Sequence, residues 1–171
     1  EELSHLSDLK SLFDLSLNNC PISDQGLKKI CQLSGLEILN LGETMVTGEG
    51  INEFDNLSRL QTLYLRGTNL TDDGLRQITR SRSLRYLDIS QTQVTFENLP
   101  ELANLKNLTT LHATYCKATD LGLFSVSKIP NLQILALGTW GEGSCLTDHG
   151  MMYLTNLTQL RNLSLEGTNV T

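Results

Sequence analysis

The chain has 171 residues, of which 39% are hydrophobic and 19% charged, with a formal net charge of −6 and an isoelectric point near 5.0. This length is sufficient for one well-buried domain, whereas the acidic balance and the absence of a lysine or arginine cluster argue against a nucleic-acid-binding surface. No apolar run in the sequence is long enough to span a bilayer, so we expect neither nucleic acid nor a membrane among its partners.

Leucines open seven segments of nearly constant length. They stand at Leu12, Leu36, Leu60, Leu84, Leu108, Leu132 and Leu160. The first five steps are 24 residues long and the last is 28. Leu3, Leu6 and Leu9 precede them at helical spacing. We therefore expect residues 1–11 to be the helical end of a preceding repeat, and residues 12–171 to hold six full repeats followed by a partial repeat that starts at residue 160.

Within each segment the apolar spacing changes from two residues to three. In the segment LQTLYLRGTNLTDDGLRQITRSRS, at residues 60–83, leucines first alternate with polar residues. Later parts of the segments show the wider spacing, as in Leu99, Leu102 and Leu105. Alternation predicts a short strand, and the wider spacing predicts a return in helical or 3₁₀ conformation. Strands joined through such returns lie parallel, and stacked units bury a core that no single unit could bury.

A polar motif recurs where each return begins, as in TNLTDDGL at residues 68–75. Its serine or threonine can cap orphan backbone N–H groups, and its aspartate is favoured by the helix dipole in the first turn. Its glycine lacks a Cβ and would let neighbouring turns approach closely. The ligand spacing and the closing glutamate of a calcium loop are absent, so we interpret the motif as a structural joint.

With these repeats the chain resembles the leucine-rich repeat family from Leu3 to Thr171. Cys20 and Cys116 occupy a column that elsewhere holds threonine, which is similar to the cysteine-containing (F-box-associated) subtype and to 24-residue repeats of bacterial proteins. The resemblance implies an α/β solenoid. A curved parallel sheet would form its concave face, and short helices or 3₁₀ turns its convex face. No polar cap covers either end in the sequence, so we expect flanking sequence or a partner to cover them.

The cysteines and histidines predict neither a disulfide nor a metal site. Cys20 and Cys116 lie four repeats apart, roughly 19 Å at about 4.8 Å per strand, which is beyond disulfide reach. His112 and Cys116 are separated by about 13 Å of extended chain, too far to share a zinc ion. Reduced thiols favour an intracellular location, cytoplasmic or nuclear, or a bacterial protein delivered to a host cytosol. Most of the six N-x-S/T sequons arise because Asn and Thr or Ser flank a repeated leucine, so a secreted glycoprotein is disfavoured.

The outward positions of the middle strands gather residues that are typical of binding sites. They are Tyr64, Arg66, Tyr86, Asp88 and His112, with Tyr115 at the margin. Tyrosine and arginine are enriched among interface residues that carry most of the binding energy. In the alternative interpretation, Arg66 and Asp88 pair across adjacent strands and the tyrosines are ordinary surface residues.

An insertion in the sixth repeat, GTWGEGSCL at residues 138–146, supplies a second candidate site. It holds the sole tryptophan, Trp140, beside two glycines, and insertions in repeat proteins often serve binding. Alternatively, Trp140 folds over the thinner core left by Ala113 and Ala118.

No catalytic motif emerges, so we predict a non-enzymatic protein-protein interaction module without a cofactor. It would be monomeric unless exposed repeat ends pair, and would bind a partner of some basic character on its concave face. Three alternatives stay open: the substrate-recognition arm of a ubiquitin ligase complex, a bacterial effector that binds a host protein, and the targeting arm of an enzyme whose catalytic domain lies outside this chain.

Overall fold

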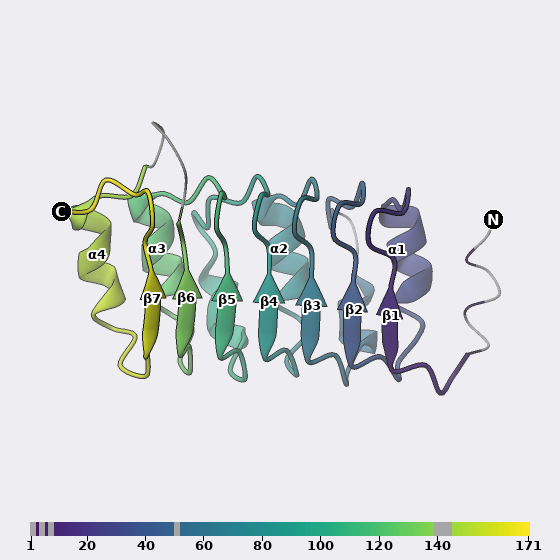
Figure 1. Ribbon diagram of the computed structural model, residues 1–171. Helices are drawn as coiled ribbons and strands as arrows, with labels where there is room; N and C mark the ends of the chain where they lie inside the picture. Colours follow the sequence, from purple (N-terminus) through teal and green to yellow (C-terminus); the bar gives the residue numbers. More distant parts are fainter. Residues whose placement is uncertain (1–2, 4–5, 7–8, 50–51, 139–144) are drawn as a thin grey trace.

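The computed structural model describes residues 3, 6, 9–49, 52–138 and 145–171. They form one seven-stranded parallel sheet whose strand order follows the chain (Figure 1). The strands are β1 (Asp14–Ser16), β2 (Ile38–Asn40), β3 (Thr62–Tyr64), β4 (Tyr86–Asp88), β5 (Thr110–His112), β6 (Ile134–Ala136) and β7 (Asn162–Ser164). The predicted parallel solenoid is confirmed.

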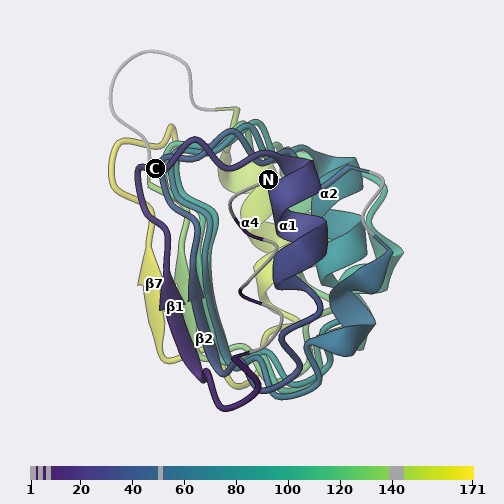
Figure 2. The same cartoon turned by 90° about the vertical axis from the view of Figure 1, so that its right-hand side faces the viewer.

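The returns lie together on one side of the sheet, and the other side carries no helix (Figure 2). They are α1 (Asp24–Ile30), η2 (Glu53–Asn56), α2 (Asp72–Ile78), η3 (Pro100–Asn104), α3 (Asp120–Val126) and α4 (Asp148–Leu154). The α-helical and 3₁₀ returns alternate as far as α3, and then two α-helices follow one another. Both 3₁₀ returns lack the aspartate of the motif: Gly48 and Phe96 occupy its place, with φ angles of +77° and +65°. A residue in this left-handed region cannot begin an α-helix at that position.

The leucine columns set the register of the sheet. Leu63 lies opposite Leu87, and Leu87 opposite Leu111, as the 24-residue step predicts. These three side chains are at most 1% exposed, and the core continues through the other leucine columns between the sheet and the returns. Because each repeat packs on its two neighbours, the core is continuous along the solenoid.

The aspartate of the motif bonds to the next repeat. The Oδ1 atom of Asp72 accepts hydrogen bonds from the backbone N–H groups of Thr95 and Phe96, each at 3.0 Å, and its Oδ2 atom accepts one from the Thr95 hydroxyl. Asp24 binds Thr47 and Gly48 in the same way. Equivalent bonds link Asp120 to Thr147 and Asp148 to Thr171. The hydrogen bonds from the Thr171 backbone and hydroxyl lower the pKa of Asp148.

The predicted capping role of the hydroxyl is confirmed for three of the helices. Thr71 and Thr119 accept hydrogen bonds from Gly74 and Gly122, and Thr147 accepts one from His149. Ser23 makes no side-chain cap to α1. The motif therefore forms hydrogen bonds both within its own repeat and to the next repeat.

We expect Asp72→Ala to lower the free energy of unfolding by about 1–3 kcal/mol, because it leaves two part-buried N–H groups without their acceptor. Chemical denaturation followed by circular dichroism measures the change. The matched control is Asp73→Ala, since the neighbouring Asp73 side chain is 72% exposed and pairs only with Arg76 of the same helix. Its change should stay within about 0.5 kcal/mol. Equal losses for the two variants would mean that the hydrogen bonds that Asp72 accepts from the next repeat contribute no stability of their own.

Candidate functional site

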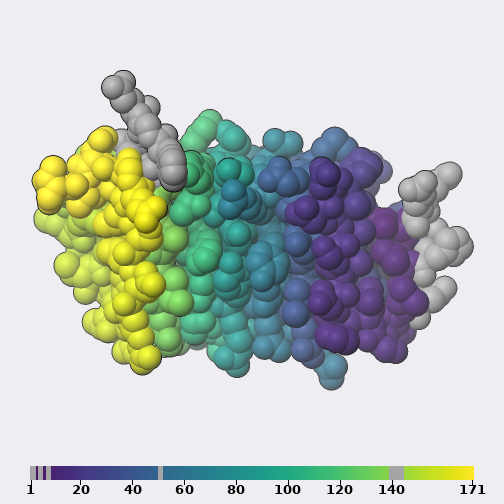
Figure 3. Space-filling model, in the orientation of Figure 1, coloured from purple at the N-terminus to yellow at the C-terminus, as the bar shows by residue number. Residues whose placement is uncertain are grey.

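Three rings form a row of tilted and edge-to-face contacts across the middle of the sheet, on the side away from the helices. Tyr86, the first residue of β4, lies between Tyr64 at the end of β3 and His112 at the end of β5. The ring centroids of Tyr64 and Tyr86 are 5.1 Å apart, and those of Tyr86 and His112 are 5.3 Å apart. The Tyr86 hydroxyl lies 3.3 Å from Nδ1 of His112. We call these three residues the aromatic row; Figure 3 shows the face of the sheet that carries it.

Asp88 places a carboxylate beside the aromatic row. In the sheet register it pairs with Tyr64 on one side and His112 on the other. Its Oδ1 atom accepts a hydrogen bond from the Ser90 backbone N–H at 2.9 Å. Burial, and then the charge of Asp88, raise the pKa of Tyr86 to about 12. The phenol is therefore neutral at physiological pH.

Arg66 and Tyr115 lie beyond the ends of β3 and β5, and the structure does not bring them into the ring stack. Arg66 is exposed and, within the part of the chain that the structure describes, forms no ion pair. The alternative pairing of Arg66 with Asp88 is thus not formed. Tyr115 is 37% exposed and has a φ angle of +59°, a conformation that costs a bulky residue about 1–2 kcal/mol. Trp140 lies outside the described residues.

Neither Cys31, which is buried, nor Cys116, which is partly buried, has the lowered thiol pKa of a reactive cysteine. Burial, and then the nearby charge of Glu53, raise the pKa of Cys31 to about 12, and burial raises that of Cys116 to about 11. Because the thiolate is the reactive form, both groups are inert at neutral pH. Cys116 instead donates a hydrogen bond to the Ile89 carbonyl of the preceding repeat, whereas Thr44 and Thr68 in the same column donate to carbonyls three residues earlier in their own repeats. Across the described ranges, no group of three His, Cys, Asp or Glu side chains could hold a metal ion.

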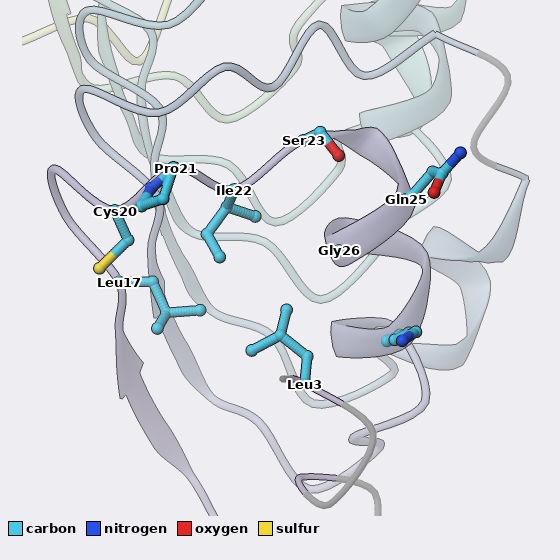
Figure 4. A pocket seen from close by; sticks show the side chains of 9 residues that line it. Leu3, Leu17, Cys20, Pro21, Ile22, Ser23, Gln25 and Gly26 are labelled. Carbon is cyan, nitrogen blue, oxygen red and sulfur yellow. The ribbon is translucent and has the colours of Figure 1, made fainter. Parts of the chain in front are cut away.

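One hollow of about 640 Å³ lies between β1 and α1, at the N-terminal end of the sheet (Figure 4). Leu17 and Ile22 line it and are only partly buried, whereas their equivalents in the next repeat, Leu41 and Val46, are fully buried. The hollow is therefore the open end of the hydrophobic core rather than a ligand pocket. No helix in the described ranges is long and apolar enough to cross a membrane.

Our reading of the sequence missed a second surface, on the helices. Leu121 and Phe124 of α3 and Met152 of α4 are 66%, 49% and 58% exposed. The signal was present in the sequence, since apolar residues occupy helix positions where α1 and α2 carry polar ones.

Comparisons with known proteins agree with this architecture. The model of the Leucine Rich repeat family matches residues 9–31 and 57–78. A search of curated protein sequences gave no significant match. Internalin C2 of Listeria monocytogenes is similar in structure, with a TM-score of 0.71 and 28% sequence identity over 94% of this chain and 64% of that one.

Internalin F of the same organism has a TM-score of 0.70 and 22% identity, covering 99% of this chain and 52% of that one, and this likeness concerns the fold alone. The chain thus spans less than two thirds of either internalin. Similarity to the cysteine-containing subtype stays a prediction. The matched repeats, the ordered parallel sheet and the two structural likenesses together show that the chain has the fold of a leucine-rich repeat solenoid.

Proposed function

We propose that this chain is a non-enzymatic protein-interaction module that binds a partner protein on the helix-free face of its sheet. The observation that carries the proposal is the aromatic row, in which Tyr64, Tyr86 and His112 are held in mutual contact on three adjacent strands. Half-buried tyrosines on a rigid sheet offer a large contact area and lose little conformational freedom when a partner binds.

The charges around the aromatic row would give the site its selectivity. Asp88 lies beside the row and Arg66 beyond it, and neither forms an ion pair in the described part of the chain. A partner that offers a basic group to Asp88 and an acidic group to Arg66 would match both. Charge complementarity of this kind favours specificity and the rate of association more than affinity. The net charge of −6 favours a partner of basic character overall.

Among the wider roles, a bacterial effector that binds a host protein is supported by the structural likeness to internalin C2 of Listeria monocytogenes. A location in a host cytosol would accord with the two buried, neutral thiols, Cys31 and Cys116.

The test is affinity capture by the immobilised chain from a bacterial lysate and, in parallel, from a human cell lysate. The comparison variant is Tyr64→Ala/Tyr86→Ala, with its fold confirmed by circular dichroism. We expect a partner that the wild-type chain retains and the variant loses, and a dissociation constant raised about 30-fold or more for the purified partner.

Two further variants serve as controls. Asp14→Ala/Asn162→Ala changes exposed positions of β1 and β7, at the two ends of the same face, and should retain the partner. Tyr86→Phe keeps the ring but removes the hydroxyl near His112, which separates stacking from hydrogen bonding. A partner that the Tyr64→Ala/Tyr86→Ala variant binds as tightly as the wild-type chain would contradict the proposal.

A further inference from the structure

The outward positions of α3 and α4 differ from those of α1 and α2 in one respect. At the second helix position, α1 and α2 carry Gln25 and Asp73, whereas α3 carries Leu121. The fifth position makes the contrast stronger, and its residues along the chain are Lys28, Arg76, Phe124 and Met152. The same fold thus accepts charged residues at positions where the last two helices expose apolar ones. The fold does not require this apolar surface.

The neighbouring returns turn this surface into a groove. Helices α1 and α2 are each followed by a 3₁₀ return, but α3 and α4 follow one another and pack together. Beside α3 lies a groove of about 450 Å³, lined by Leu99, Leu121, Phe124, Lys128 and Tyr153 among others. The Phe124 and Tyr153 rings meet edge to face, with centroids 5.5 Å apart. The volume falls within the roughly 300–1,000 Å³ typical of ligand sites.

The two charged side chains that line the groove, Lys128 and Glu97, differ in how free they are to pair with an occupant. The Lys128 ammonium lies 4.1 Å from the centroid of the Phe124 ring and forms no ion pair among the residues that the structure describes. The Glu97 carboxylate, in contrast, already accepts a hydrogen bond from the Thr119 hydroxyl at 2.6 Å. An occupant would therefore find an available positive charge in an apolar setting, where a carboxylate is favoured.

The size of the surface limits what can occupy it. Two adjacent helices of seven residues present about 10 Å by 20 Å, or about 200 Å². A standard protein interface needs about 800 Å² from each partner, so the surface is too small to hold a second folded copy of the chain by itself. A short segment that inserts one or two side chains fits the dimensions.

We propose that the groove beside α3 binds a short acidic amphipathic segment of a partner protein. The apolar side chains of the segment enter the groove and pack against Leu121 and Phe124, and a carboxylate pairs with Lys128. This site lies on the helix side of the molecule, so it is separate from the aromatic row and does not depend on the function proposed for the sheet.

The test uses a displayed library of random 12-residue peptides, selected in parallel on the wild-type chain and on Leu121→Asp/Phe124→Arg. That variant places the residues of α2 on α3, where an aspartate and arginine pair already exists in the same fold. We expect the wild-type chain alone to enrich peptides with apolar residues three or four positions apart and acidic residues beside them. For one such peptide, measured by fluorescence anisotropy, the variant should raise the dissociation constant about 30-fold or more.

Two other variants test the parts of the proposal. Lys128→Glu should raise the dissociation constant of the acidic peptide by about tenfold or more, because it reverses the charge and leaves the apolar groove in place. Tyr64→Ala/Tyr86→Ala should bind the peptide as the wild-type chain does, so that failure of one site is distinguishable from failure of the other.

Three outcomes would overturn the proposal. The first is equal enrichment on the wild-type chain and on Leu121→Asp/Phe124→Arg, and the second is enrichment of basic peptides. The third is a peptide dissociation constant that Lys128→Glu leaves unchanged. Analytical ultracentrifugation tests whether a second copy of the chain occupies the groove. A wild-type dimer that Leu121→Asp/Phe124→Arg abolishes would assign the groove to a second copy of the chain instead.

Discussion

Replacing Leu87 with alanine is expected to lower the free energy of unfolding by about 2–5 kcal/mol. Leu87 is fully buried in β4, with Leu63 on one side and Leu111 on the other. A solenoid is stabilised by the contacts of each repeat with its two neighbours. Truncating Leu87 therefore leaves a cavity that weakens both interfaces of the fourth repeat, and the close-packed neighbours can fill it only in part.

Urea denaturation followed by circular dichroism measures this loss. The matched control is Leu163→Ala, which alters the same column on β7. Leu163 is 40% exposed and pairs with β6 alone. Its truncation should cost less than about 1 kcal/mol, because less apolar surface leaves water when it folds. A loss under about 1 kcal/mol for Leu87→Ala would mean that the leucine register is wrong.

The fold followed from the sequence because its repeat length fixes the register. Every 24-residue step brings the same column to the neighbouring strand, so Leu63, Leu87 and Leu111 had to face one another. Alternation in the strands then decides which side chains face the core. For the same reason, Tyr64, Tyr86 and His112 could be placed on one face before their ring contacts were known. Their role in binding stays a prediction.

The alternation of α-helical and 3₁₀ returns was not predicted, although the sequence contains its signal. Aspartate follows the hydroxyl residue at Asp24, Asp72 and Asp120, and Gly48 and Phe96 replace it in the intervening repeats. The donors in the next repeat that bind this aspartate were hidden as well, because a hydrogen bond from Thr95 to Asp72 joins residues far apart along the chain.

Side-chain conformations were beyond the reach of the sequence. The register made a pair between Arg66 and Asp88 conceivable, since Asp88 ends β4 and Arg66 lies just beyond the end of the adjacent β3. Whether such an exposed pair forms depends on a balance of less than about 1 kcal/mol between attraction and side-chain entropy. The apolar surface on α3 and α4 was hidden for another reason: a pattern of apolar residues on a helix does not reveal which of them the neighbouring returns leave uncovered.

Gly74→Ala should lower the free energy of unfolding by about 3 kcal/mol, although the opposite sign would be expected from helix propensity. Gly74 lies inside α2, where alanine is normally about 1 kcal/mol more favourable than glycine. A Cβ at this position would stand 2.0 Å from the Thr47 carbonyl oxygen of the preceding repeat. That oxygen belongs to the backbone and cannot rotate away, so the two returns must separate. Thermal and chemical denaturation of the purified variant measure the loss.

Gly26→Ala is the matched control, because Gly26 occupies the same helix position in α1. A Cβ there would meet only side-chain atoms, of Ile22 and Leu3, both at 3.1 Å, and these can move by a few tenths of an ångström. Its effect should stay within about 1 kcal/mol in either direction. Equal effects at Gly26 and Gly74 would show that the glycine column serves the helix itself. A loss confined to Gly74 would show that the column sets how closely one return approaches the next, and so fixes the spacing on which the sheet and its aromatic row depend.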